Sequence, residues 1–576
     1  MGSLTGLLVF SWIAASLLVS GLADQKKQYD ADVAKTIVEL QQFRATATGT
    51  VRTAAGKQGI ATLINLNPRI NAWHLLKVTW NGDKDESAWH LENAKPGSNV
   101  IELDPAFQKG LVIIQGKERY QCDLFGGANL LEQGRSSQLI YVPLCGGRIY
   151  LRNPSKGHKT ALESVTEFVR DQVYGGEKVI DIFHHVLADR YQETGELHTA
   201  GADSAPASAE RPVPALIDPK YANQRIGPTN LGITLETGNA AMEPGAWYAA
   251  VADSGIYVSI MRANLIDPKI LSSNRSMVNT LDGVENASLV YLVAFDLDRF
   301  EAAYEIGTVH PRVEWATHLL PRMKNPNMPG PDGIGTIAPL AATGLIRPDL
   351  GKKTIAAFTG GYKRDHSAFN SGDLAQVNHG SHYGIIENGV VLSKLQPGLA
   401  TVYSMDDGTL DMKTWTEADN TSLARVRYAR QNGVALAEVD GSGTTLPGKL
   451  VSRWGPGNWS GNEDSRLRSI RASMAILKSH GKRFMVYAIF SDATPSSMAR
   501  VYQAYQCSYA MLTDMNALEH TYMALYRHTG SELIVEHLLK GMNQLDQTGP
   551  GKNIPRFLGF SDNRDFFYVV HKGVNR

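Results

Sequence analysis

The sequence predicts a multidomain protein: an N-terminal all-β domain of sandwich type, a helical connecting segment, and a large C-terminal α+β domain with a mixed sheet. The chain has 576 residues, about four times the length of a common domain. Short apolar segments separated by turn residues recur through its first quarter, as in a β-sandwich. An Ala/Ser/Pro-rich stretch with almost no large apolar side chain then interrupts the chain at 198–214, as a linker would.

The composition argues against nucleic-acid binding and against cysteine-rich sites. Lys plus Arg and Asp plus Glu both number 57, so no overall charge attracts the protein to nucleic acid or to an anionic membrane. Three cysteines are too few for a disulfide-built scaffold or for a zinc site made of several thiolates. The sequence therefore predicts no nucleic-acid partner.

Residues 1–23 predict export. The run from Gly6 to Ala23 has no charged residue and ends in small residues before Asp24. These features are typical of a cleaved signal peptide, whereas the length of the run also fits a retained membrane anchor. Either alternative places the protein in the periplasm, in the medium or on the outer side of a membrane.

Residues 24–160 form the predicted β domain. A helix is expected near Asp30 to Arg44, and strands follow from TGTVRTA to QLIYVPL. Cys122 and Cys145 lie in two strand-like segments, which leaves either a disulfide or two separate buried thiols. Cys507 lies in an apolar stretch and is expected to be packed.

The remaining chain divides at the linker. Residues 161–197 have apolar positions at helical spacing and form the predicted connecting segment. Residues 215–576 contain alternating apolar segments suited to a sheet, together with the predicted helices Arg466–Leu477 and Ser496–Tyr505. Glu387-Asn388-Gly389 is expected to be a hairpin turn whose acidic residue serves the turn.

Polar segments that follow apolar strands carry the candidate chemistry. The sequence has no Walker A loop, no HExxH, no G-x-S-x-G and no Rossmann fingerprint. The candidate segments are Thr359-Gly360-Gly361-Tyr362, Arg430-Gln431-Asn432-Gly433, the segment of Arg471, and TDMNALEH with Asp514, Asn516 and His520. A Gly-Gly turn at a strand end lets the backbone approach a ligand and offer it N–H groups.

In this order, the segments in the last half of the chain resemble those of the phosphodiester glycosidase family. Thr359–Tyr362 is similar to the family's Gly-Gly-aromatic strand end, residues 471–475 to its R-T-A-x-G segment, and residues 512–516 to its L-D-G-G-G-S strand end. The chain departs from this pattern because Met515 and Asn516 replace glycines and because Ala-Ser follows Arg471. The resemblance implies a glycosidase-like hydrolase, and the departures leave open an altered substrate or a loss of activity.

The implied reaction assigns a role to each candidate. A phosphate leaving group needs little protonation, so the site needs a cation for the phosphate and a carboxylate near the anomeric carbon. Arg471 and Arg430 are the phosphate candidates, and Asp514 is the carboxylate. His520 would assist proton transfer, and the predicted substrate-binding residues are Thr359, Gly360, Gly361, Arg430, Asn432 and Asn516.

Alternatives remain for these residues and for the whole protein. Asp514 could cap a helix, and Arg471 could lie on the surface of an amphipathic helix. The expected partner is a carbohydrate or sugar phosphate, and the alternative is a non-catalytic envelope protein that binds glycan or is purely structural. No cofactor is predicted, although a divalent metal is not excluded. His184 and His185 would point about 100° apart on a helix and so do not form a metal pair, whereas His379 and His382 lack a third ligand for a metal site.

Overall fold

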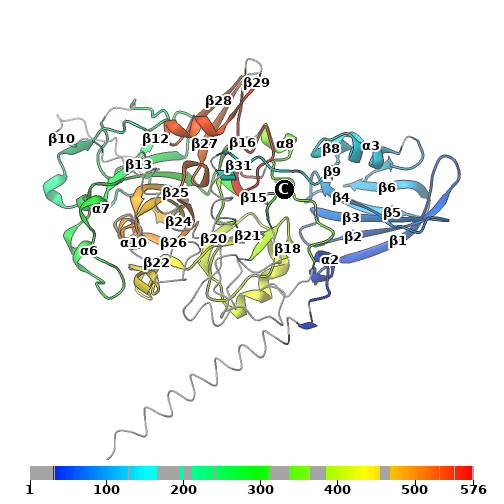
Figure 1. Ribbon diagram of the computed structural model, residues 1–576, viewed down its shortest axis with the longest axis horizontal. Helices are drawn as coiled ribbons and strands as arrows, with labels where there is room; N and C mark the ends of the chain where they lie inside the picture. The colour runs from blue at the N-terminus through cyan, green and yellow to red at the C-terminus, as the bar shows by residue number, and fades with distance from the viewer. Residues whose placement is uncertain are drawn as a thin grey trace, which may run out of the picture.

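The computed structural model consists mainly of antiparallel β-sheets (Figure 1). It describes residues 27, 30–31, 33–127, 129–161, 163–164, 195, 197–199, 210–238, 241–310, 336–363, 384–453, 468–530, 532–549 and 552–573. All pairs of neighbouring strands within these ranges are antiparallel. The prediction of a mixed sheet is therefore wrong for the described part of the chain.

The N-terminal strands form two sheets around one apolar cluster, as a sandwich requires. Buried side chains of both sheets, among them Val51, Leu76, Ile101 and Leu111, share this cluster. In sheet order the larger sheet contains β1 (Ala45–Arg52), β2 (Gln58–Asn65), β3 (Trp73–Trp80), β4 (Ser87–Asn93), β9 (Ile149–Arg152) and β8 (Tyr141–Leu144). The smaller sheet contains β5 (Asn99–Asp104), β6 (Phe107–Gln115) and β7 (Glu118–Asp123).

Helices are short in this part of the molecule. Among the described residues they include α2 (Ile37–Leu40) and α3 (Leu130–Ser136). The predicted helix Asp30–Arg44 is confirmed only in part, because Asp30, Ala31 and α2 are helical whereas residues 33–34 and 42–43 form turns. The capping box of Thr36 and Glu39 starts α2, which ends after one turn. Cys122 and Cys145 form a disulfide, with their Cα atoms 5.3 Å apart, and Cys507 is buried.

The body of the protein contains three larger sheets and two hairpins. The eight-stranded sheet has the order β12 (Tyr248–Ala249), β13 (Ile256–Arg262), β14 (Leu289–Asp296), β25 (Lys482–Ala493), β24 (Ser469–Ser479), β26 (Cys507–Met515), β22 (Ala435–Val439) and β23 (Thr445–Pro447). One five-stranded sheet has the order β15 (Phe300–Glu305), β31 (Phe566–His571), β16 (Thr354–Thr359), β27 (Met523–Thr529) and β28 (Glu532–His537). The other has the order β18 (Val390–Ser393), β17 (Ile385–Glu387), β21 (Val426–Gln431), β19 (Ala400–Met405) and β20 (Leu410–Thr414). The hairpins are β10 (Leu197–Thr199) with β11 (Gln224–Ile226), and β29 (Gln547–Gly549) with β30 (Lys552–Ile554).

In the described ranges, the α-helices of the body are α6 (Pro268–Ser272), α7 (Gly283–Ala287), α8 (Pro348–Gly351) and α10 (Pro495–Ala504). α10 confirms the prediction for Ser496–Tyr505, whereas the predicted helix Arg466–Leu477 is wrong because these residues belong largely to β24. None of the helices in the described ranges is long and apolar enough to cross a bilayer. Residues 1–23, 165–194 and 200–209 lie outside those ranges, so the export segment, the connecting helix and the linker stay predictions.

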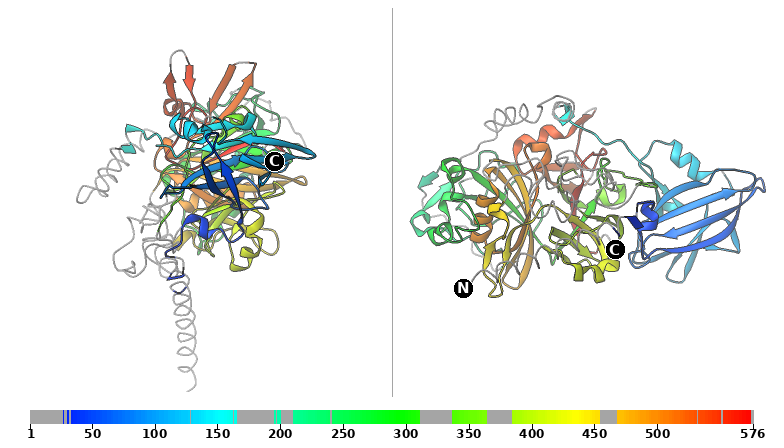
Figure 2. Two further views of the ribbon diagram at one scale, coloured as in Figure 1. Left: turned by 90° about the vertical axis from the view of Figure 1, so that its right-hand side faces the viewer. Right: turned by 60° about the horizontal axis from the view of Figure 1, so that its bottom comes forward.

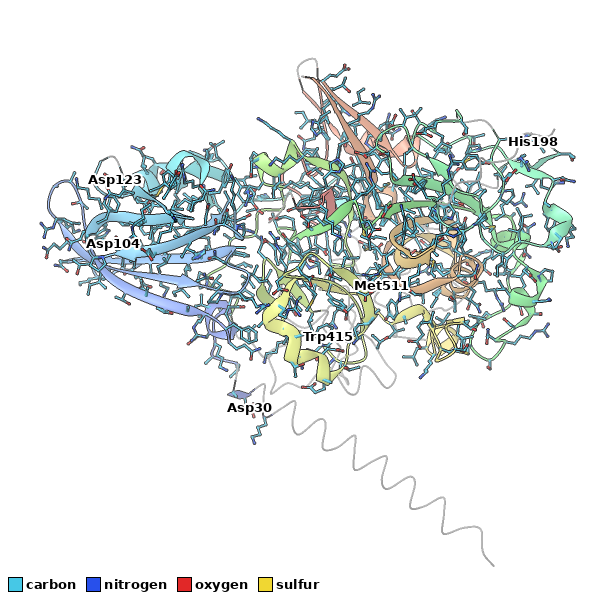
Figure 3. The ribbon with its side chains drawn as sticks, turned by 180° about the vertical axis from the view of Figure 1, so that it is seen from behind. Asp30, Asp104, Asp123, His198, Trp415 and Met511 are labelled. Carbon is cyan, nitrogen blue, oxygen red and sulfur yellow. A yellow bond between two sulfur atoms is a disulfide. The ribbon has the colours of Figure 1, made fainter. Side chains whose placement is uncertain are left out.

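The N-terminal sheets lie at one end of the molecule, beside the body (Figures 1 and 2). Figure 3 shows Asp104 and Asp123 of these sheets far from His198 of β10, which lies at the opposite end. The prediction that residues 198–214 are all linker is wrong for His198 and Thr199, because these two residues pair with β11.

Buried charges join the N-terminal sheets to the body. Arg152 of β9 donates to Glu92 of β4 (2.9 Å) and to Glu387 of β17 (2.7 Å), and it lies 3.3 Å from Glu305 of β15. Arg347 donates to the other oxygen of Glu92 (2.7 Å). We call these five residues the interface cluster. Burial raises the pKa of Glu305 well above its ordinary value and also raises that of Glu387.

The predicted hairpin around Glu387 is present, since β17 pairs with β18 across Asn388-Gly389. The role predicted for the acidic residue is wrong. Glu387 is fully buried, and its carboxylate also accepts from the backbone N–H of Ile306 (3.1 Å). Glu387 therefore serves the interface cluster rather than the turn.

Candidate functional site

The Gly-Gly turn follows β16 and packs against polar groups of the body. Gly360 donates its N–H to the carbonyl of Asp565 (2.9 Å). A Cβ atom on Gly361 would lie 2.9 Å from Nη2 of Arg430 and 3.1 Å from Oδ1 of Asn432. Glycine is needed here because the backbone approaches these side chains closely. The N–H of Gly360, predicted to face a ligand, faces Asp565 in this structure.

Arg430 lies at the end of β21 and is 1% exposed. Its Nε donates to Oδ2 of Asp565 (2.6 Å), its Nη1 to the carbonyl of Gln431 (2.5 Å), and its Nη2 to the carbonyl of Tyr362 (2.5 Å). Asp565 also accepts from the hydroxyl of Tyr304 (2.9 Å). These bonds tie β21 to the Gly-Gly turn and to the start of β31, so Arg430 has a framework role whatever it does toward a ligand.

Asn432 joins the Gly-Gly turn to the strand of Asp514. Its amide nitrogen donates to the carbonyls of Leu512 (2.9 Å) and Thr513 (2.5 Å) in β26. Its amide oxygen accepts from the N–H of Tyr362 (3.2 Å). Segments about 150 residues apart in the sequence are thereby in contact.

Asp514 is a buried carboxyl beside a cation. It lies near the end of β26, is 3% exposed, and accepts from Nη1 of Arg564 (2.5 Å). Burial raises its pKa to about 7, although Arg564 and Lys363 oppose this shift and Asp565 adds to it. Titration near neutral pH suits a group that acts as a general base or stabilises positive charge.

Arg471 lies next to the end of β26, because its backbone is paired with that of Met515. It is fully buried, and it donates from Nε to the carbonyl of Ala493 (2.7 Å) and from Nη1 to the sulfur of Met515 (3.0 Å). The hydroxyl of Tyr362 donates to the same sulfur (3.0 Å). Burial lowers the pKa of Arg471, and the surface-helix alternative for this residue is wrong.

His520 ends a 3₁₀ turn, Leu518–His520, directly after the strand of Asp514. Its Nδ1 lies 2.6 Å from the carbonyl of Met515, and only an N–H can donate to a carbonyl, so the second ring nitrogen, Nε2, carries the lone pair. Burial, with Arg564 adding to the effect, lowers the pKa of His520 well below its ordinary value, and the ring is neutral. The hydroxyl of Thr359 donates to the carbonyl of His520 (2.7 Å), which links β16 to this turn.

Asn516 has a positive φ of 81°, which asparagine tolerates better than most residues. Its side-chain oxygen accepts from the hydroxyl of Ser469 (2.8 Å), and its N–H donates to Ile470 (2.9 Å). These bonds face β24. Asp514 does not cap a following α-helix, since β26 continues to Met515 and only the 3₁₀ turn follows.

Four residues of the site were missed at the sequence level: Glu163, Lys363, Asn563 and Arg564. Lys363 donates to Oε1 of Glu163 (2.5 Å), Asn563 donates to the same oxygen (3.1 Å), and Nη2 of Arg564 lies 3.1 Å from it. All four are buried. We call Lys363, Asn563 and Arg564 the donor triad.

The sequence contains features that indicate Lys363, Asn563 and Arg564. Lys363 directly follows the Gly-Gly-Tyr segment, and SDNRD at 561–565 is a polar run before the apolar strand FFYVV. Residues 561–565 are all buried, in contrast to the residues of an ordinary surface loop. Glu163 had no comparable signal.

In the described part of the chain, no three His, Cys, Asp or Glu side chains are grouped so that they could hold a metal ion. His184, His185, His379 and His382 lie outside that part. The predicted absence of a cofactor stays a prediction.

Comparison with known proteins adds little to this geometry. No protein-family model matches the chain, and no curated protein matches it. Among solved structures, the chain is similar to the catalytic domain of zebrafish N-acetylglucosamine-1-phosphodiester alpha-N-acetylglucosaminidase, auto-inhibited by its pro-peptide. The match has 12% identity and a TM-score of 0.29, and it covers 56% of this chain and 85% of that one. The two structures agree too loosely for any conclusion to rest on the match.

Proposed function

We propose that the protein is a hydrolase that cleaves a sugar from a phosphodiester-linked or cell-envelope glycan, with Asp514 as the carboxylate that acts at the anomeric carbon. One observation carries the proposal. The Gly-Gly turn, Arg430 to Asn432, Arg471 and the Asp514–His520 segment are separate in sequence, yet they meet in one buried polar cluster.

The chemistry of such a reaction fits this cluster. Breaking the anomeric C–O bond develops positive charge on the sugar, and the phosphate monoester leaves as an anion without full protonation. Ionised Asp514 would stabilise the sugar cation or activate water, and Nε2 of the neutral His520 would accept a hydrogen bond from that water or from a sugar hydroxyl. Buried Arg471 would hold positive charge close to Met515 and the Gly-Gly turn.

The decisive experiment measures sugar release from a model sugar-1-phosphodiester. We expect Asp514→Asn to lower kcat by at least about 100-fold, since a positioned acid or base contributes roughly 10²- to 10⁴-fold. The matched control is Asp85→Asn, which changes an exposed aspartate in the turn between β3 and β4. Equal rates for wild type and Asp514→Asn would refute the assignment.

A second candidate is a glycan-binding protein of the same fold without turnover. It is favoured because Arg430, Asn432 and Asp514 already form hydrogen bonds with other groups of the protein. Glycan-array binding that survives Asp514→Ala and Arg471→Ala, with no turnover of the phosphodiester, would support this candidate over the enzyme.

Export is part of the proposal. It is supported by the apolar run Gly6–Ala23 and by the Cys122–Cys145 disulfide, because disulfides persist in oxidising compartments. Expression of the full chain, followed by N-terminal sequencing of the exported protein, tests it. A mature chain that starts at Asp24 indicates a cleaved signal, and an intact N-terminus in the membrane fraction indicates an anchor.

A further inference from the structure

The donor triad converges on a single oxygen. Lys363, Asn563 and Arg564 come from the Gly-Gly turn and from the segment before β31, and all three meet Oε1 of Glu163. Two of the three are cations, and every member is at most 3% exposed. Buried, charge-assisted donors on one oxygen are the usual construction of an oxyanion site.

Glu163 reaches this position from a segment that follows the N-terminal sheets. His158 donates its N–H to the carbonyl of Ser561 (2.8 Å), and its ring contacts that of Phe560 edge to face. Thr160 accepts from the N–H of Glu163 (3.0 Å), as a helix N-cap does for its third residue. The Glu163 carboxylate thus comes from a part of the chain that the body's sheets do not contain.

Arg564 connects the donor triad to Asp514. Its Nη1 donates to Asp514 and its Nη2 faces Glu163, so the two carboxylates lie at two nitrogens of one guanidinium. A sugar phosphodiester needs a phosphate-binding site next to the catalytic carboxylate. Its phosphate is attached through one oxygen to the anomeric carbon, and the carboxylate acts at that carbon. Arg564 would then contact both the phosphate, in the place of the Glu163 carboxylate, and Asp514.

Charge balance points to the same ligand class. Lys363 and Arg564 supply two positive charges that meet at the Glu163 carboxylate, and Arg564 also pairs with Asp514. Removing the Glu163 carboxylate takes away the anion that these two cations share in a buried place, which is costly. A phosphodiester carries a single negative charge and would supply an anion at that place.

We propose that the donor triad is a binding site for the phosphate of a phosphodiester, and that the Glu163 carboxylate occupies this site in the present structure in place of the ligand. This inference rests on the proposed function for the identity of the substrate. It also replaces Arg430 with Lys363 and Arg564 as the groups that bind phosphate, since Arg430 is engaged with Asp565 and two backbone carbonyls.

Phosphate binding to the full chain tests the inference without any turnover. Isothermal titration calorimetry at pH 7.5 would use inorganic phosphate and, as a singly charged diester, dimethyl phosphate. We expect Glu163→Gln to bind both at least tenfold more tightly than wild type, because the internal competitor has lost its charge. Adding Lys363→Met to Glu163→Gln should remove that gain. The control is Glu532→Gln, an exposed glutamate in β28, which should bind as wild type does.

A second variant covers the case in which Glu163→Gln fails to fold. Glu163→Asp keeps the charge but shortens the side chain by one methylene, so it should compete less well and bind phosphate severalfold more tightly than wild type. Folded variants at position 163 with wild-type affinity for both probes would overturn the inference. A gain in affinity without any sugar release would uphold the phosphate site and count against the proposed hydrolase. Sugar release without any gain in phosphate affinity would support the proposed hydrolase and count against the phosphate site.

Discussion

The interface cluster allows a quantitative prediction for Arg152→Met. Arg152 is 1% exposed, contacts three carboxylates, and lies with its guanidinium 3.9 Å above the ring of Trp73. Methionine retains much of the side-chain length but leaves Glu387 and Glu305 buried beside each other without this cation. Breaking a buried ion pair by removing one partner costs about 3–5 kcal/mol, so we expect a loss of that size in the free energy of unfolding.

Urea titration followed by tryptophan fluorescence would measure this loss. Arg119→Met is the matched control, because Arg119 also contacts two carboxylates in the N-terminal sheets but is half exposed. Such a surface pair contributes about 0–1 kcal/mol. Neutralising Glu387 and Glu305 in the Arg152→Met background should recover at least half of the loss. An Arg152→Met loss no larger than that of Arg119→Met would refute the view that buried charge joins the two parts.

Three further predictions concern the site and the disulfide. Burial raises the pKa of Asp514 from 3.8 to about 7, so between these values the native protein holds a proton that the unfolded chain releases. The stability of wild type relative to Asp514→Asn should therefore fall by up to about 4 kcal/mol as the pH rises from 4 to 7. A difference in calorimetric Tm between the two proteins that does not change with pH would contradict this. Gly361→Ala should destabilise the protein by about 1–3 kcal/mol in urea titrations, since the new Cβ would meet Arg430 at 2.9 Å, and a neutral effect would mean that the turn shifts freely. Cys122→Ser with Cys145→Ser should cost roughly 3 kcal/mol for a sequence separation of 23 residues, measured by urea titration, and a loss below about 1 kcal/mol would show that the link constrains little.

Local patterns predicted the N-terminal strands well and β24 badly. Strands such as β2 are short apolar segments bounded by turn residues, and this pattern is visible in the sequence. In β24 every residue except Lys478 is buried, because the strand lies between β25 and β26 inside a sheet covered on both faces. Such a strand has no alternation, and its Ala, Met and Leu residues also favour helix.

The candidate site was accessible to sequence reasoning only in part. Asp514 and Arg471 could be selected because each belongs to a short segment beside an apolar strand. Their partners could not, since Arg564 and Glu163 lie 50 and about 350 residues from Asp514 and nothing local specifies those pairings. Arg430 was assigned to phosphate because arginine suits that role in general, whereas its engagement with Asp565 depends on the tertiary fold.

The position of β31 has a consequence for the synthesis of the protein. This strand lies between β15 and β16, yet the ribosome makes it about 200 residues after β16. Until then the two flanking strands lack their common neighbour, and Arg430 and Asp514 lack Asp565 and Arg564. The nascent body therefore has two incomplete sheet edges for much of its translation, and unpaired edges of this kind are prone to pair with other chains.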